Sequence, residues 1–304
     1  ADVAFQIAKI YIKQDKPREA MEQYENYLDD YADKGTEDRR LQAHVKVGLY
    51  YWRHDEKERA LEEFEETLEV YKEVPDDKKK KLTKGRDAAA QAKFMIGEDI
   101  YKDMAEIGVE SSDEEELQKK FKEKMKVAKK AQKIYEEVIK FRRPDWAIAA
   151  LFKIGAQYQN FAETIRDSPV PERLTYNQKE IYRGLLEDKA MQVEKLAVRA
   201  YERALTTAKN ESWFNQYSKK AEIRLADLRP KKYRKPSEIR ATPDHIHPGY
   251  SRADFIEKLR EDEGRLDKLG NESGGGSPSP KAGSKASEKG DSAKATQKSG
   301  EPAS

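Results

Sequence analysis

The sequence predicts an all-α protein, a solenoid of four helical hairpins followed by a closing helix and a disordered C-terminal tail. The main observation is a pattern of small, aromatic and aliphatic residues that occurs four times in the first two thirds of the chain. The second is composition: 39% of the 304 residues are charged and the mean hydropathy is −1.04, which suits the thin core of a helical array. The third is that no segment has the pattern of a β-strand.

Each copy of the pattern has two elements. In the first, a Gly or Ala precedes a large residue by three positions; in the second, an Ala is followed at four-residue steps by an aromatic and an aliphatic residue. Each element is expected to be a helix, because residues three and four apart share one helix face. The small residue would let the second helix approach, and the aromatic ring would fill the space. The first elements are Ala8/Tyr11, Gly48/Tyr51, Gly97/Ile100 and Gly155/Tyr158; the second are Ala20/Tyr24/Leu28, Ala60/Phe64/Leu68, Ala131/Tyr135/Ile139 and Ala197/Tyr201/Leu205.

In chain order, we expect hairpins at 1–33, 41–74, 86–141 and 146–209 and a closing helix at 213–229, all within one repeat domain over 1–230. Ser212 is the predicted cap of the closing helix. Three prolines, at positions 75, 144 and 230, each follow a helical stretch and are expected to stop it. Proline removes a backbone donor and disfavours helical conformation in the residue before it.

The third and fourth hairpins are expected to contain elongated helices. The small residue and the alanine of the second element are twelve residues apart in the first two copies, but 34 and 42 apart in the last two. The inserted segments open with capping boxes and contain no proline breaks, so they favour long second helices at 113–141 and 176–209. The capping boxes are Ser112-x-x-Glu115 and Thr175-x-x-Gln178.

Both ends of the chain differ from the repeats. Residues 231–269 are predicted to be an extended segment with room for one short helix at 251–269. From Gly270 to Ser304 no large apolar residue occurs, so 270–304 is predicted to be a disordered, low-complexity tail. At the start, the pattern begins at once from Ala1 without an initiator Met, which leads us to expect upstream repeats in a longer protein.

Over 1–230 these residues resemble the tetratricopeptide repeat (TPR) family, whose pattern of Gly/Ala, Tyr, Ala, aromatic and trailing Pro recurs every 34 or so residues. The fit is strong in the first two copies and interrupted by the insertions in the last two. The resemblance implies a scaffold that binds other proteins or extended peptides and catalyses no reaction.

A narrower resemblance covers 144–230. The stretches that carry it are Pro144 to Leu151, Tyr158 to Phe161, Pro169-Val170-Pro171 and Leu186 to Ala190. They are similar to the C-terminal repeats of myxobacterial cell-envelope TPR proteins, some of which are similar to components of the gliding-motility machinery. This similarity implies a periplasmic or outer-membrane-associated scaffold, with a cytoplasmic location as the alternative.

The TPR resemblance also implies a concave groove lined by the first helix of each hairpin. Residues beside the small positions would face this groove, and several of them are basic around a central tryptophan. Such a groove would suit an acidic or extended peptide, and a merely solvated helix face is the alternative. The predicted groove residues are Phe5, Lys9, Lys13, Lys46, Leu49, Trp52, Arg53, Lys102, Lys153 and Asn160.

Two basic segments, 78–86 and 229–235, suggest a second function, electrostatic binding of nucleic acid or anionic lipid. With 60 basic against 58 acidic residues, the net charge of +2 provides no general attraction to nucleic acid. Nucleic acid is therefore the less favoured partner. The longest apolar stretch, Ala147 to Phe152, falls far short of the roughly 20 residues of a membrane helix. The membrane association expected for the scaffold is indirect.

Catalysis, cofactors and metals have little support in the sequence. Cysteine is absent, no Ser/His/Asp spacing recurs, and no glycine-rich phosphate loop follows a strand, so we predict no catalytic residue, no cofactor and no small-molecule substrate. The closest approach to a metal site is Asp244 with His245 and His247. It lacks further ligands from a separate segment, so no metal site is predicted.

Overall fold

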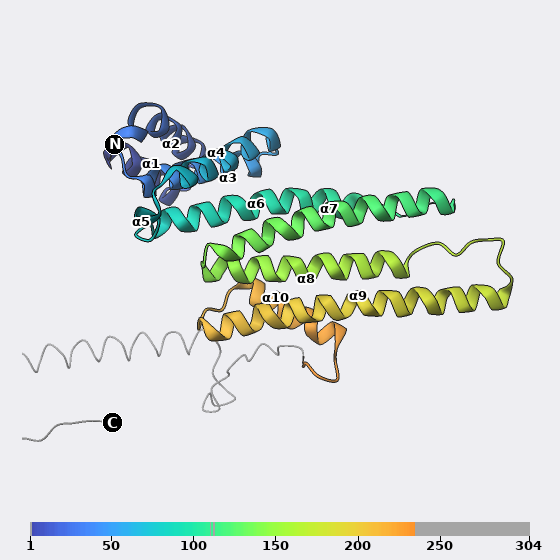
Figure 1. Ribbon diagram of the computed structural model, residues 1–304. Helices are drawn as coiled ribbons and strands as arrows, with labels where there is room; N and C mark the ends of the chain where they lie inside the picture. The colour runs from blue at the N-terminus through green and yellow to red at the C-terminus, as the bar shows by residue number, and fades with distance from the viewer. Residues whose placement is uncertain (1, 110, 112, 235–304) are drawn as a thin grey trace, which may run out of the picture. The chain divides into compact units, whose positions relative to one another are not determined.

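The computed structural model describes residues 2–109, 111 and 113–234. This described part contains ten α-helices, one short 3-10 helix and no β-strand, which confirms the all-α prediction (Figure 1). The predicted helix at 251–269 and the predicted tail at 270–304 lie outside the described residues. The helices are α1 (Asp2–Lys13), α2 (Pro17–Tyr31), α3 (Glu37–Arg53), α4 (Lys57–Glu73), α5 (Asp76–Lys79), α6 (Lys84–Glu106), α7 (Glu114–Lys140), α8 (Pro144–Arg166), α9 (Tyr176–Asn210) and α10 (Gln216–Leu228).

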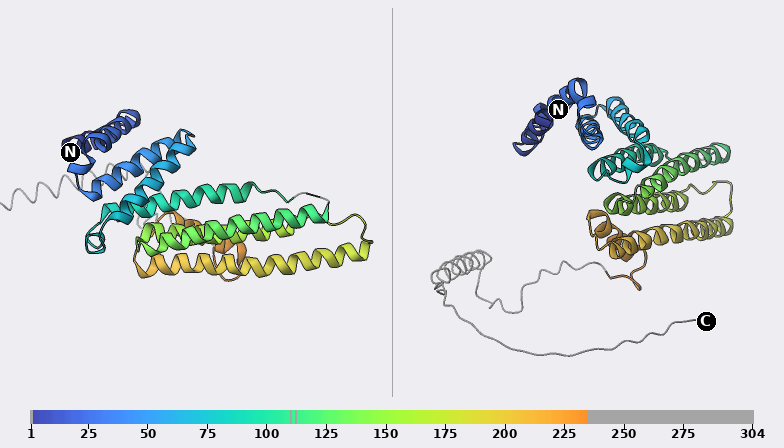
Figure 2. Two further views of the ribbon diagram at one scale, coloured as in Figure 1. Left: turned by 45° about the horizontal axis from the view of Figure 1, so that its top comes forward. Right: turned by 60° about the vertical axis from the view of Figure 1, so that its left-hand side comes forward.

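The helices pack as sequential hairpins. α1 pairs with α2, α3 with α4, α6 with α7, and α8 with α9, so the four predicted hairpins are present. Neighbouring hairpins then pack together: α2 contacts α3, both α3 and α4 contact α6, and α7 contacts α8. α10 packs against α8 and α9 at the end of this series (Figure 2).

The close approach predicted between paired helices is present in three hairpins. A Cβ atom added to the glycine of the first helix would lie only 2.6 to 2.8 Å from the aromatic ring of the second helix. Each ring is completely buried, because it occupies the space that the missing side chain leaves. The three pairs are Gly48 with Phe64, Gly97 with Tyr135, and Gly155 with Tyr201.

Aromatic contacts join the third and fourth hairpins to the closing helix. The ring centroid of Phe94 in α6 lies 5.6 Å from that of Tyr135, 5.3 Å from that of Trp146 and 5.8 Å from that of Tyr217. These partners belong to α7, α8 and α10. Aromatic pairs at such distances contribute beyond their buried area. One buried ring therefore helps to hold four helices in place around the candidate site described below.

The two predicted long helices are present, with one change of cap. α9 has 35 residues and begins at the expected box, where the Thr175 backbone N–H donates to Gln178 Oε1 at 2.9 Å. α7 has 27 residues, but its N-cap is Asp113, whose carboxylate accepts from the Glu115 N–H at 3.0 Å. The predicted cap, Ser112, lies outside the described residues. Asp113 is well suited to this position because its side chain accepts from the second helical N–H.

The closing helix begins later than predicted. Ser212 has a φ of 51°, and the N–H of Trp213 donates to the Ala208 carbonyl at 2.8 Å. This is the left-handed turn that ends a helix, so Ser212 terminates α9 and does not cap α10. The cap of α10 is Asn215, whose side chain accepts from the backbone N–H of Tyr217 and of Ser218. α5, a single helical turn after Pro75, was not predicted from the sequence.

One face of α1 is apolar and open. Val3 is 72% exposed and Ile10 is 52% exposed, and Ile7 between them is also exposed. These residues are spaced four and three apart, so they share one side of the helix. α1 packs mainly against α2, whereas α3, α6 and α8 each have helices on more than one side.

Replacing Gly155 with alanine tests the close approach of paired helices. Alanine favours a helix over glycine by roughly 1 kcal/mol, but the new Cβ would lie 2.6 Å from the Tyr201 ring. We therefore expect Gly155→Ala to lower the free energy of unfolding by about 1–3 kcal/mol, as overpacking does. Urea unfolding followed by circular dichroism measures the change.

Gly184 provides the matched control, because it also lies within a helix, α9, but a Cβ there meets no atom within 4 Å. Gly184→Ala should raise the free energy of unfolding by roughly 0.5–1 kcal/mol. If both substitutions changed stability in the same direction, the proposed role of Gly155 would be wrong.

Candidate functional site

The structure does not gather the ten predicted groove residues into one groove. Phe5 is only 4% exposed and packs edge-on against Tyr24 and Tyr27 of α2. It lies three residues before Ala8, so helical spacing puts it on the same buried face. Leu49 packs against the same core. These two residues hold the first hairpins together, and Phe5 is inaccessible to a partner.

Four predicted basic residues lie on α1 and α3, outside the two cavities described next. Lys9 is half-buried, and Lys13, Lys46 and Arg53 are exposed. Lys46 is reached by water, yet the surrounding protein partly desolvates its ammonium group, which lowers the pKa of Lys46, and repulsion from Arg53 lowers it further. These side chains add positive charge to the first helices without forming a pocket.

Trp52 and Lys102 meet in a cavity of about 350 Å³, here called the Trp52 cavity. The Lys102 Nζ lies 5.8 Å from the centroid of the Trp52 ring, within the range of a cation–π contact. Lys57 also lines this cavity and forms ion pairs with Asp99 at 2.8 Å and Asp103 at 3.6 Å. Four carboxylates and two ammonium groups line it, so the Trp52 cavity itself is not basic. The carboxylates belong to Asp55, Asp99, Asp103 and Glu106.

Lys153 and Asn160 meet in a larger cavity of about 540 Å³, here called the α8 cavity. It lies among the first helices of the third and fourth hairpins, the closing helix and one tyrosine of α9. α8 provides Phe152, Lys153, Ala156, Gln159, Asn160 and Glu163; α6 provides Glu98 and Tyr101; α9 provides Tyr201; and α10 provides Tyr217, Lys220 and Arg224.

The charge of Lys153 is neutralised within the α8 cavity. Its Nζ lies 2.5 Å from a Glu98 carboxylate oxygen and 4.6 Å from the centroid of the Tyr101 ring. Tyr135 donates its hydroxyl hydrogen to Glu98 at 2.6 Å. Burial raises the pKa of Tyr101, and the negative charge of Glu98 raises it further. Lys153 therefore orders the cavity wall and is not a free cation.

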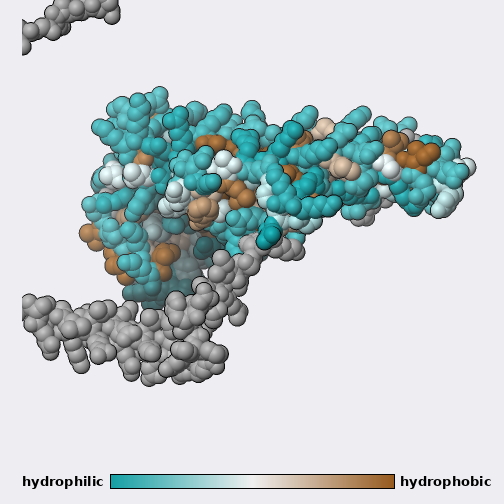
Figure 3. Space-filling model, turned by 90° about the horizontal axis from the view of Figure 1, so that it is seen from below, coloured by the Kyte–Doolittle hydropathy of each residue, from teal (hydrophilic) through white to brown (hydrophobic). Residues whose placement is uncertain are grey.

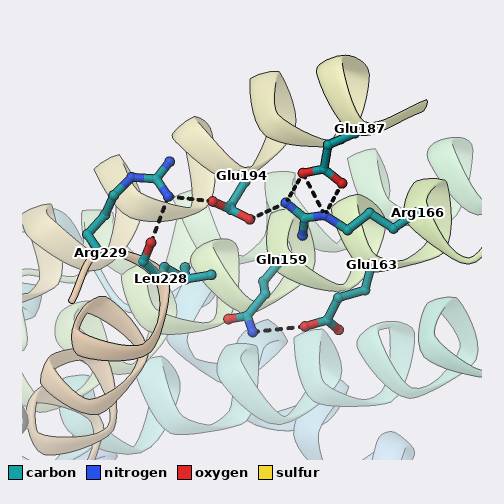
Figure 4. Close-up of polar contacts among 7 residues, drawn as sticks. All are labelled: Gln159, Glu163, Arg166, Glu187, Glu194, Leu228 and Arg229. Atoms are coloured by element: carbon teal, nitrogen blue, oxygen red, sulfur yellow. Dashed lines mark hydrogen bonds and ion pairs between the residues drawn. The ribbon is translucent and has the colours of Figure 1, made fainter. Parts of the chain in front are cut away.

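The amide side chains of α8 differ in how well they are paired. Gln159 accepts from the Tyr201 hydroxyl at 2.8 Å and donates to Glu163 at 2.9 Å, the latter contact being visible in Figure 4. Asn160 Oδ1 is buried and accepts no hydrogen bond from the described residues. A buried acceptor without a donor is costly. Asn160 therefore leaves one unsatisfied acceptor enclosed within the protein behind the cavity wall.

The closing helix supplies cations that the sequence analysis did not assign to the groove. Lys220 and Arg224 are four residues apart, so they share one face of α10 with Tyr217 between α6 and α8. The Lys220 Nζ lies 5.3 Å from the centroid of the Tyr217 ring. Within the part of the chain that the structure describes, neither cation forms an ion pair. The four-residue spacing of Lys220 and Arg224 in the predicted closing helix already places them on one helix face. The sequence could therefore have assigned them to the groove if this helix had been considered as one of its walls.

A buried carboxylate fixes the closing helix to the fourth hairpin. Glu194 of α9 is 8% exposed at its side chain and pairs with Arg166 of α8 at 2.5 Å and with Arg229, just after α10, at 2.6 Å (Figure 4). Arg166 also pairs with Glu187 at 3.0 Å. Burial by itself would raise the pKa of Glu194, but hydrogen bonds from both arginines outweigh it and hold the pKa below its ordinary value.

The basic segment 229–235 is partly committed to the fold. Arg229 binds Glu194, and Lys232 binds Glu202 at 2.7 Å. Tyr233 also donates to Glu202. Lys235 lies outside the described residues. Because two of its cations already have carboxylate partners, this segment offers less charge to a phosphate than its sequence indicated.

Seen from the side of α9 and α10, the surface is mainly hydrophilic, and apolar residues form small separate groups (Figure 3). Exposed apolar side chains in the early turns of α9 are those of Tyr176, Ile181 and Leu185. No helix in the described residues is both long and apolar enough to cross a bilayer.

The described ranges contain no cluster of three or more His, Asp or Glu side chains placed to hold a metal ion. The weak candidate at Asp244, His245 and His247 lies outside the described residues. No protein-family model matches the sequence, and no curated protein sequence matches it.

Replacing Glu194 with glutamine tests the ion-pair network. Because hydrogen bonds to charged groups are strong, Glu194→Gln should lower the free energy of unfolding by about 1–3 kcal/mol at neutral pH. Glu187→Gln is the matched control, since its carboxylate is half-exposed and pairs with the same Arg166, and its effect should stay below about 1 kcal/mol.

The effect of Glu194→Gln should also depend on pH. The folded-state pKa of Glu194 is lowered, so its stabilisation is present above the unfolded pKa of about 4.3 and is lost as the pH falls through the folded pKa. The urea midpoints of wild type and variant should therefore converge in acid. A constant difference between them across this range would contradict the assigned role.

Proposed function

We propose that this chain is a non-enzymatic TPR scaffold that binds an extended segment of a partner protein along the first helices of its hairpins. The observation that carries this proposal is the α8 cavity, where aromatic rings and two cations without an ion pair in the described residues, Lys220 and Arg224, line one space. The glycine–aromatic pairs of three hairpins support the TPR assignment, because they are the positions where that repeat pattern demands a small and a large residue.

The lining of the α8 cavity favours a peptide with a carboxylate. Lys220 and Arg224 can pair with an acidic side chain, and an arginine can do so through two parallel hydrogen bonds. Tyr101 and Tyr217 offer ring surface for apolar side chains. Since Lys153 is already paired with Glu98, we assign the recognition of charge to α10 and not to α8.

We further propose that the scaffold belongs to a cell-envelope assembly, of which gliding motility is one candidate, in the periplasm or at the outer membrane. This part of the proposal rests on the resemblance of 144–230 alone. Fractionation of the tagged protein in its native host tests it, and recovery in the cytoplasmic fraction would contradict it.

The binding proposal is tested by neutralising Arg224. Arg224→Gln removes an exposed charge, so the fold should be retained while capture of the partner falls by about tenfold or more, the equivalent of ~1.4 kcal/mol. The measurement is affinity capture from nuclease-treated extract of the native host, followed by quantitative mass spectrometry. Arg203→Gln is the control, since Arg203 is an exposed arginine of α9 outside the cavity.

Two results would overturn this assignment. Capture unchanged by Arg224→Gln would remove the α8 cavity from the binding surface. Capture abolished by neutralising Lys231 and Lys232, or dependent on added nucleic acid, would favour the electrostatic alternative through 229–235 instead.

A further inference from the structure

A second recess, separate from the α8 cavity, lies where α4, α6 and α7 meet beside the turn after α5. Its volume is about 440 Å³. Leu68, Tyr71 and Phe141 form its apolar wall, and Lys80, Lys140 and Arg142 lie around it. We call these six residues and the space between them the basic pocket. It shares no lining residue with the α8 cavity.

The apolar wall of the basic pocket is recessed. The ring centroids of Tyr71 and Phe141 are 5.2 Å apart in a tilted arrangement, and both rings are half-buried together with Leu68. Aromatic and aliphatic surface that is reachable but set back fits one inserted apolar side chain. Such a recess is the usual setting for the anchoring residue of a protein contact.

Some cations beside this wall are already used by the fold. Lys93 pairs with Glu137 at 2.6 Å. Arg86 donates to the backbone carbonyls of Lys79 at 3.1 Å and of Lys80 at 2.9 Å, and so fixes the turn after α5. These contacts give the pocket a defined wall before any partner arrives.

Other cations at the pocket have no carboxylate partner. Within the described residues, Lys80, Lys140 and Arg142 form no ion pair. Glu137 is the one carboxylate among the described lining residues, and six cations line the same space. The pocket therefore combines a recessed apolar wall with a surplus of positive charge at its edge. This combination favours an anionic partner that also carries an apolar group.

We propose that the basic pocket binds a short acidic segment of a partner protein. One large apolar side chain of that segment enters beside Tyr71 and Phe141, and its flanking carboxylates pair with Lys80, Lys140 and Arg142. This is a second docking site, which neither requires nor replaces binding in the α8 cavity.

A peptide fits the basic pocket better than a bilayer or a nucleic acid. A bilayer accepts apolar side chains that project, whereas Tyr71 and Phe141 are set back. A nucleic acid needs a positive track along its backbone. Here the cations surround one recess, and two of the six already have carboxylate partners: Lys79 pairs with Asp76 at 3.2 Å and Lys93 with Glu137 at 2.6 Å. The charge that is left suits a short segment better than a long polyanion.

The test uses the full chain carrying Arg224→Gln, which removes the arginine assigned to acidic peptides in the α8 cavity, and a fluorescein-labelled peptide, Asp-Asp-Phe-Leu-Asp-Glu, in fluorescence anisotropy. Arg142→Gly is the main variant, because Arg142 has a φ of 53° and glycine adopts this conformation without strain. It should weaken peptide binding by about fivefold or more, with an unchanged melting temperature. Lys129→Gln is the matched control, an exposed lysine of α7 away from the pocket, and should change binding less than about twofold.

The peptide itself provides further controls. Replacing its acidic residues by Asn and Gln, or its Phe and Leu by Ser, should each reduce binding, because the pocket needs both charge and an apolar anchor. The proposal is overturned if the Arg224→Gln chain does not bind the acidic peptide saturably, if either altered peptide binds equally well, or if Lys129→Gln is as damaging as Arg142→Gly. Saturable binding of phosphatidylserine vesicles or single-stranded DNA that Arg142→Gly abolishes, without peptide binding, would reassign the pocket to an electrostatic surface.

Discussion

The close approach of two helices at a glycine is the constraint on which the rest of this structure depends. Gly48, Gly97 and Gly155 each leave room for one buried aromatic ring of the paired helix. The ring fixes both the distance and the register of the pair, since a buried ring has few alternative positions at interior packing density. Because the second helix of one hairpin then meets the first helix of the next, this local contact also determines how hairpins follow one another. The α8 cavity exists where that succession brings α6, α8 and α10 together.

The hairpins were predictable from sequence because their chemistry is local. The pairing of Gly97 with Tyr135 could be inferred across an insertion, since each residue kept its place in a repeated pattern. The site was less predictable, because its residues come from segments far apart in the chain. Tyr101 and Arg224 are 123 positions apart and become neighbours only through packing. The prediction placed Phe5 in the groove because it lies near Ala8 in the sequence. Phe5 is three residues before Ala8, however, and so lies on the same buried face of α1.

Charge explains a further limit of the sequence. In a chain with 39% charged residues, a basic segment does not indicate a binding site until the carboxylates that pair with its cations are known. Lys153 and Lys57 are held by carboxylates that lie far away in the sequence, so the groove that seemed basic contains paired charges. Lys220 and Arg224 on α10, and Lys140 and Arg142 beside α7, form no ion pair within the described residues and line cavities built from segments far apart in the chain. What distinguishes a candidate binding surface here is an unpaired cation beside a cavity, a combination that only the fold creates.

The open apolar face of α1 has a consequence for how the molecule moves. α1 packs mainly against α2, whereas the fourth hairpin is held by its own long pairing, by α7, by α10 and by the pairs of Glu194. In a linear array, resistance to local opening follows the number of neighbours that each unit has. Fewer neighbouring helices therefore restrain α1 than restrain α8 and α9. Within the described residues, the packing is therefore graded: it is sparse at α1 and dense around the α8 cavity.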